Sequence, residues 1–131
     1  MNPNSFEFLS IRRRAFNSAK LDLSSSWQLD KSAFIYSLVN TENRPLLFDH
    51  SSSDTSSIYS SPSYGPLFGR GKDLVIMDNS NTNTSSYSKL GNTYTHPEYP
   101  YGSEKSRKIL AGTQYFKVQE IEIFQMQTIV Q

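Results

Sequence analysis

Apolar residues recur along the chain in short runs that polar turn residues separate. The run at 33–39 reads AFIYSLV; it is apolar on both faces and rich in β-formers, which predicts a well-covered strand. The turn signal NTENR precedes PLLFD at 45–49, so the two runs predict a hairpin. Pro45 cannot donate to a strand ladder, so we expect it at the start of the second strand or on an edge. A third apolar strand is expected at 72–78, KDLVIMD.

Long polar segments between these runs predict loops. Residues 50–65 are dense in serine and low in complexity, which is typical of a surface loop. Within it, Ile58 and Tyr59 are candidates for a brief strand. Residues 79–86 read NSNTNTSS, and their side chains can bond their own backbone and compete with regular structure.

Helical signals are few. Residues 103–110 predict two turns of helix, with Ser103 as the N-cap and Gly112 just beyond the last turn. No segment with a helical period exceeds about ten residues. Short strands, polar loops and scattered glycines therefore predict a mainly β, antiparallel domain, α+β by strict count, with one or two short helices.

The end of the chain does not fit a simple strand. In QYFKVQEIEIFQMQTIV, strict alternation would place on one face Phe116, Val118, Glu120, Glu122 and Phe124. A half-buried strand would not tolerate two carboxylates in line with three apolar residues. We therefore expect a bulge between Val118 and Ile121, which would switch the inward set to Ile121 and Ile123.

The stretch YGPLFGRGKDL at 64–74 has the glycines and lysine of a phosphate-binding loop, but not their spacing. Such a loop needs four residues between its glycines and a hydroxyl after the lysine, and it opens a helix. Here five residues separate Gly65 from Gly71, Asp73 stands at the hydroxyl position, and a strand follows. The stretch is better explained as a turn.

In that explanation, the glycines supply a positive φ or a close backbone approach, and an aromatic residue anchors the turn. The residues with these roles are Gly65, Gly69 and Gly71, with Phe68 as the anchor. The turn would deliver residues 74–77 into the core at a fixed register.

Composition limits the function classes. The 131 residues suffice for one domain, and a net charge of +1 gives no reason to expect nucleic acid or an anionic membrane as partner. The cluster at 12–14, three arginines, is interpreted as a solvated tail. The absence of cysteine excludes disulfides, zinc–thiolate sites and cysteine nucleophiles. With no secretory signal and no membrane-spanning segment visible, we expect a soluble, intracellular protein of the cytoplasm.

Candidate catalytic residues are sparse. His50 lies in FDHSSSD beside a carboxylate and several serines, and Glu120 and Glu122 form a second, acid/base candidate. A polar loop and a structural glutamate are the more ordinary explanations. The remaining Asp and His residues show no metal-ligand spacing, so we expect neither a metal nor a cofactor.

The tyrosines of TYTHPEYPYG are the interaction candidates. Two prolines separate Tyr94, Tyr99 and Tyr101, which predicts a semi-rigid, amphipathic surface of the kind that interfaces favour. The alternative is that these tyrosines cover the sheet locally.

Taken in order, the pieces of the chain resemble the TLDc domain of oxidation-resistance proteins. These pieces are an aromatic strand ending in Ser-Leu, the turn Gly-Pro-x-Phe-Gly-x-Gly, the segment Tyr-Ser-x-x-Gly-x-x-Tyr that contains Gly91, and an ending Glu-Ile-Glu-Ile-Phe. They span residues 24–125, which we take as the domain, with a poorly defined segment at 1–23 and a tail at 126–131.

The resemblance implies a two-sheet β-sandwich that acts as a non-enzymatic protein–protein interaction module. It also implies a role in resistance to oxidative stress, and some members of the family engage the vacuolar proton-pumping ATPase. Residues 15–28 lack the glycine pair usual before the tryptophan, and Arg70 replaces a common glycine. We therefore expect a domain shortened at its N-terminus. A small hydrolase-like enzyme using His50 or the Glu120–Glu122 pair is the alternative function, and a shortened product without independent function is a third.

Overall fold

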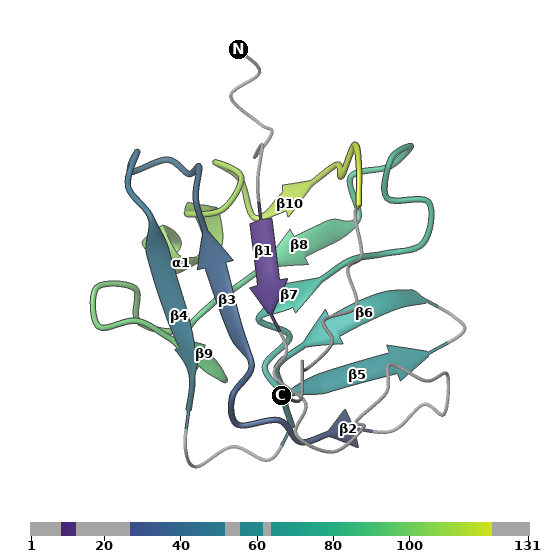
Figure 1. Cartoon of the computed structure of the whole chain (residues 1–131). Helices are drawn as coiled ribbons and strands as arrows, with labels where there is room; N and C mark the ends of the chain where they lie inside the picture. Colours follow the sequence, from purple (N-terminus) through teal and green to yellow (C-terminus); the bar gives the residue numbers. More distant parts are fainter. Residues whose placement is uncertain (1–8, 13–26, 52–55, 62–63, 122–131) are drawn as a thin grey trace, which may run out of the picture.

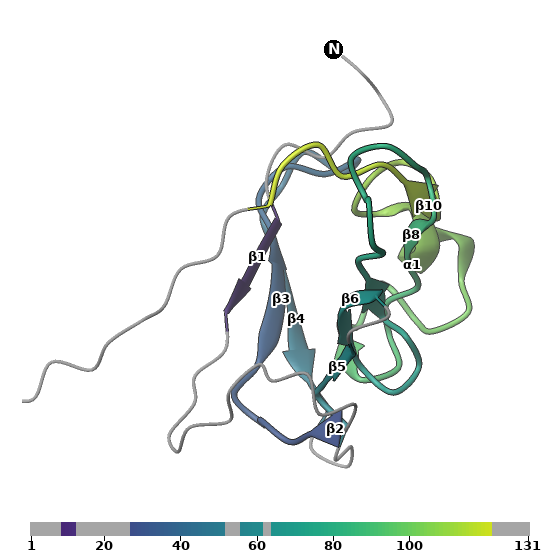
Figure 2. The same cartoon turned by 90° about the vertical axis from the view of Figure 1, so that its right-hand side faces the viewer.

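The computed structural model describes residues 9–12, 27–51, 56–61 and 64–121. Two antiparallel sheets face each other as layers (Figure 2). The four-stranded sheet has the order β1-β3-β4-β9, with bounds Leu9–Arg12, Phe34–Ser37, Leu46–His50 and Tyr94–Thr95. The six-stranded sheet has the order β10-β8-β7-β6-β5-β2, with bounds Tyr115–Phe116, Ser86–Ser88, Leu74–Val75, Tyr64–Phe68, Ile58–Ser61 and Trp27–Gln28. This is the mainly β sandwich that the sequence predicts.

The hydrophobic core lies between the two sheets. In β4, Leu46 and Phe48 are buried whereas Leu47 and Asp49 are exposed, the alternation of a strand with one face inward. The buried face of the six-stranded sheet meets this layer with Ile58, Phe68, Leu74 and Phe116. The hairpin of β3 and β4 is confirmed, with Ile35 opposite Phe48.

The one helix of the described residues, α1 (Glu104–Lys108), is short and begins as expected (Figure 1). The Ser103 side chain accepts a hydrogen bond from the Ser106 N–H. At the other end, Gly112 has φ +84° and its N–H donates to the Lys108 carbonyl at 2.8 Å. Ser103 and Gly112 therefore satisfy backbone groups that a helix end leaves free. The described part of the chain contains no helix of the length and apolarity that a membrane crossing requires.

The last described segment differs from the expectation. Strand β10 ends at Phe116, and no strand follows it through Ile121. The Val118 N–H donates to the Ser80 carbonyl at 2.8 Å, so the chain leaves β8 to bond the loop that precedes it. Ile121 is 53% exposed, and the expected inward switch at Ile121 is therefore wrong. Ile123, Glu122 and Phe124 lie outside the described residues.

Candidate interaction surface

The glycine turn between β6 and β7 has no room for side chains. A Cβ on Gly65 would lie 2.5 Å from the Ile76 carbonyl oxygen, and one on Gly71 would lie 2.5 Å from Asn92. Gly69 has φ +86°, and a Cβ there would collide with the Asp73 carboxylate. Phe68 beside it is buried in the core. These positions require glycine for close approach and for backbone conformation.

The amides of this turn are already used within the protein. Gly69 N–H donates to the Ser57 carbonyl at 2.9 Å, and Lys72 N–H donates to the Gly69 carbonyl at the same distance. Arg70 N–H donates to Thr93 Oγ1 at 3.0 Å. The amides of these three residues therefore bond protein acceptors, which a phosphate-binding loop would keep free for its ligand.

Asp73 fastens the six-stranded sheet to β9 of the other sheet. Its side chain is fully buried, and its Oδ2 accepts hydrogen bonds at 3.0 Å from the N–H groups of Asn92, Thr93 and Tyr94. Its own carbonyl accepts the Lys89 N–H at 3.0 Å. We call this arrangement the Asp73 clasp.

Within the clasp, the Asp73 carboxyl group has a raised pKa. Burial raises its pKa from 3.8 to about 6, since a charge is disfavoured away from water. Hydrogen bonds from the amides of Tyr94, Thr93, Asn92 and Gly91 act in the opposite direction and favour the carboxylate. The amides stabilise the Asp73 carboxylate, but its burial outweighs them, so ionised Asp73 lowers the free energy of unfolding.

A second joint between the sheets centres on Ser57. Its Oγ lies 2.7 Å from His50 Nε2, at the end of β4, and accepts the Asp30 N–H at 2.7 Å. Its carbonyl accepts from the Tyr94 hydroxyl and from Gly69 N–H, both at 2.9 Å. Ser57 therefore links both sheets and the glycine turn.

The Ser57–His50 hydrogen bond resembles that of a nucleophile and its base, but its surroundings do not fit catalysis. Ser57 is fully buried, so its hydroxyl is closed to a substrate. Within the described residues, His50 Nδ1 is buried with no hydrogen-bond partner, whereas a carboxylate orients a triad histidine at that nitrogen. We assign the pair to the joint between the sheets.

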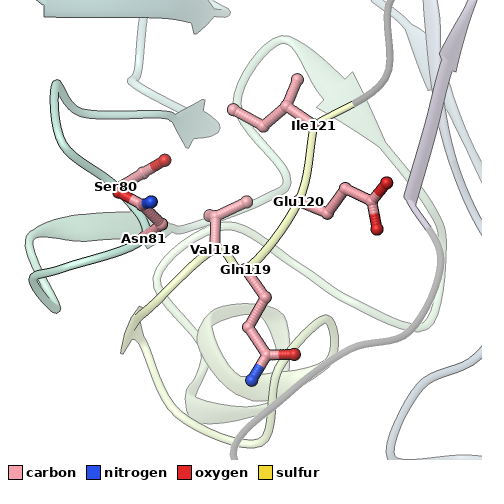
Figure 3. A pocket seen from close by; sticks show the side chains of 6 residues that line it. All are labelled: Ser80, Asn81, Val118, Gln119, Glu120 and Ile121. Carbon is pink, nitrogen blue, oxygen red and sulfur yellow. The ribbon is translucent and has the colours of Figure 1, made fainter.

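The other catalytic candidate lies elsewhere. Glu120 is exposed and lines a small open depression of about 170 Å³, together with Ser80, Asn81, Val118, Gln119 and Ile121. Figure 3 shows the Glu120 carboxylate pointing away from Ser80 and Asn81. Its expected partner Glu122 is outside the described residues. The structure therefore does not bring His50 and Glu120 into one site, and among the described residues no three His, Asp or Glu side chains gather as a metal site would require.

Two of the three tyrosines expected at the surface are in the core. Tyr94 and Tyr99 are fully buried, so the expectation that they form an exposed surface is wrong. Tyr94 faces inward because it alternates with exposed Thr95 along β9. Tyr99 packs on Phe48 with ring centroids 5.6 Å apart. Tyr101 is 50% exposed and stays a candidate for the interaction surface. The segment before it packs closely on Gly91 (φ +111°), where a Cβ would lie 2.6 Å from the Tyr101 backbone nitrogen.

The six-stranded sheet carries a different set of aromatic residues on the face away from the core. Residues directly opposite each other on neighbouring strands share a face. The pairings Trp27–Tyr59, Tyr59–Leu67, Leu67–Val75, Val75–Tyr87 and Tyr87–Tyr115 run across all six strands. We call this set the outer row.

The outer row is covered at its centre and open at its two ends. Leu67 and Val75 are buried, whereas Trp27 is 39% exposed and Tyr115 is 56% exposed. The rings are paired at each end, with centroids 5.2 Å apart for Trp27 and Tyr59. With five strand spacings between them, the two ends lie roughly 24 Å apart; Figure 1 shows β2 and β10 at opposite ends of the sheet.

Sequence reasoning missed the outer row and both joints. A signal for the outer row was present in part, because Tyr59 and Tyr115 adjoin the core residues Ile58 and Phe116, and Tyr87 lies between buried Ser86 and Ser88. That signal requires the strand register, which residue patterns alone did not supply. Asp73 was noted only as a misfit in a phosphate loop, and Ser57 was one serine among many.

Comparison with known proteins adds the family. The TLDc domain family model matches residues 14–127 of the chain. Searches of curated proteins and of solved structures returned no match. Since the family match covers most of the chain, and the fold is the two-sheet β-sandwich that the resemblance implies, the chain belongs to the TLDc domain family.

Proposed function

We propose that this domain is a non-enzymatic protein–protein interaction module that serves resistance to oxidative stress, with a subunit of the vacuolar proton-pumping ATPase as its partner. Family membership supports the module. The outer row carries the proposal on the structural side, because it presents aromatic side chains at the two ends of one sheet.

The exposed ends have the chemistry of binding hot spots. Tryptophan and tyrosine are enriched at such positions because they offer a large contact area and order few torsions on binding. Trp27 is already packed on Tyr59, and Tyr115 on Tyr87, with 5.3 Å between the second pair of ring centroids. These side chains therefore lose little further freedom when a partner covers them.

The proposed role in oxidative stress is indirect. This chain has no cysteine, so it cannot reduce a peroxide through a thiol of its own. Methionine oxidation is a poor substitute, because restoring the thioether needs a separate reductase. Protection would therefore pass through the partner that the domain binds and regulates.

A native pull-down tests the proposal. The immobilised wild-type domain is expected to retain subunits of the vacuolar ATPase from lysate at a stoichiometric level, measured by quantitative mass spectrometry. The double variant W27S/Y115S should retain about tenfold less, or lower still. Tyr101→Ser tests the remaining candidate separately, since Tyr101 is similarly exposed but lies outside the outer row.

The outcomes test the identity of the partner and the location of the binding surface separately. Absence of every ATPase subunit from the wild-type pull-down would contradict the proposed partner. Retention by W27S/Y115S at the wild-type level, with loss in Tyr101→Ser, would move the interaction surface to the loop around Tyr101.

A further inference from the structure

The glycine turn lies directly beside the segment that follows β8. Lys89 N–H donates to the Asp73 carbonyl at 3.0 Å, and Gly71 is packed against the Asn92 side chain. This places on two adjacent turns the cations Arg70, Lys72 and Lys89, which we call the basic tip. Arg70 and Lys72 are exposed, and Lys89 is half-buried.

The basic tip has no neutralising carboxylate within the described residues. None of its three side chains forms an ion pair there, whereas Arg44, Lys105 and Lys108 are paired with Glu98, Glu42 and Glu104. From residue 55 to residue 97 the sequence has two carboxylates, Asp73 and Asp78. Asp73 is buried, and its oxygens accept hydrogen bonds from the amides of residues 92–94.

The backbone beneath the basic tip is fixed. Lys72 has φ +59°, a conformation that side-chain-bearing residues rarely adopt. Glycine would fit that backbone better, and two glycines already lie within three residues. This turn therefore carries a lysine where glycine would fit better, and the Asp73 clasp and the amides of Gly69, Arg70 and Lys72 hold the turn in place.

We propose that the basic tip binds an acidic, extended segment of the protein partner. This inference rests on the proposed function and names the chemistry of the partner at a second point of contact. Three cations on a fixed backbone can meet two or three carboxylates with little ordering cost. An acidic protein segment is favoured over nucleic acid because three cations are too few to follow a phosphate backbone, and the net charge of the chain is only +1.

A peptide titration tests the inference with the full chain. The probe is a fluorescein-labelled ten-residue peptide of alternating Glu and Ser, read by fluorescence anisotropy at low salt. We expect binding that R70E/K72E weakens about tenfold or more. The control K31E/K117E makes the same change in net charge at two exposed lysines outside the basic tip. It should bind at close to the wild-type level.

A milder variant separates a loss of binding from misfolding. Lys72→Gly removes one cation where the backbone already suits glycine, so its melting temperature should be no lower than that of the wild type. It should still bind the peptide several-fold more weakly. Equal weakening by R70E/K72E and K31E/K117E would overturn the inference, as would equal binding of a peptide with Gln in place of Glu. Binding of phosphatidylserine vesicles or single-stranded DNA without binding of the peptide would overturn it too.

The same variants distinguish failure of this inference from failure of the proposed function. If the ATPase binds wild type and R70E/K72E equally, the basic tip is not a contact and the proposed function stands. If the wild type binds the acidic peptide through the basic tip but not the ATPase, the proposed partner is wrong and the tip remains a site for another acidic protein.

Discussion

Asp73 offers the sharpest test of how this fold is held together. Asp73→Ala removes the acceptor for three buried N–H groups, those of Asn92, Thr93 and Tyr94. Each buried donor left without a partner costs about 1–3 kcal/mol. Removing the buried charge returns part of that cost, because a rise of the pKa from 3.8 to about 6 corresponds to about 3 kcal/mol at neutral pH. We expect a net loss of a few kcal/mol in the free energy of unfolding.

Asp73→Asn separates the two effects. An asparagine can keep a carbonyl oxygen at the position of Oδ2 while removing the charge, so at pH 7 its free energy of unfolding should equal or exceed that of the wild type. The sign of the pH dependence follows from the raised pKa. The contribution of wild-type Asp73 is fully present below its unfolded pKa near 3.8 and is lost as the pH rises through about 6. When the pH is lowered from 7.5 to 5, protonation of Asp73 should raise the free energy of unfolding of the wild type by about 1.5 kcal/mol. The asparagine variant lacks this contribution.

Urea unfolding followed by Trp27 fluorescence measures this difference at both pH values. The remaining titratable groups are the same in both proteins and cancel in the comparison. A pH dependence in Asp73→Asn equal to that of the wild type would refute the reasoning. So would an Asp73→Ala variant as stable as the wild type.

Three further substitutions test other parts of the architecture by the same unfolding assay. Gly69→Ala should cost more than Gly102→Ala, although both glycines have φ near +85°, because a Cβ at 69 meets Asp73 whereas one at 102 meets nothing within 4 Å. Ser57→Ala should cost about 1–3 kcal/mol, since it leaves the Asp30 N–H without its acceptor. Ser103→Ala should cost about 1 kcal/mol by removing the N-cap of α1.

The controls for these variants are substitutions at other positions of the same chain. Ser85 is exposed, so Ser85→Ala should change the stability by less than about 0.5 kcal/mol. Equal losses in the two glycine variants would show that backbone conformation, and not the contact with Asp73, determines the effect. A Ser57→Ala variant as stable as Ser85→Ala would remove Ser57 from the joint between the sheets.

The sequence was most informative where one local rule determined the structure. The hairpin of β3 and β4 was predictable because two β-rich runs flank a turn signal, and α1 because Ser103 and Gly112 mark its ends. The glycine turn was predictable in kind, since its spacing did not suit a phosphate and a strand followed.

The features that sequence reasoning missed depend on contacts between distant residues. Apart from His50, the partners of Asp73 and Ser57 named above lie 12 to 37 positions away, and no local pattern marks them. The prolines near Tyr99 suggested an exposed surface, but the packing of Tyr99 on Phe48 decided its burial. The end of β10 is set by the bond from Val118 to Ser80, which a periodicity argument does not include.

The most direct test of the central claim, that this domain works by presenting a surface to a protein partner, is a calorimetric titration of the purified domain into the purified vacuolar ATPase. We expect saturable binding with a negative heat-capacity change, which marks the burial of apolar surface, and a smaller change for W27S/Y115S than for Tyr101→Ser. No heat of binding from the wild-type domain at concentrations up to about 100 μM would contradict the account, because any binding would then be weaker than about −5.5 kcal/mol.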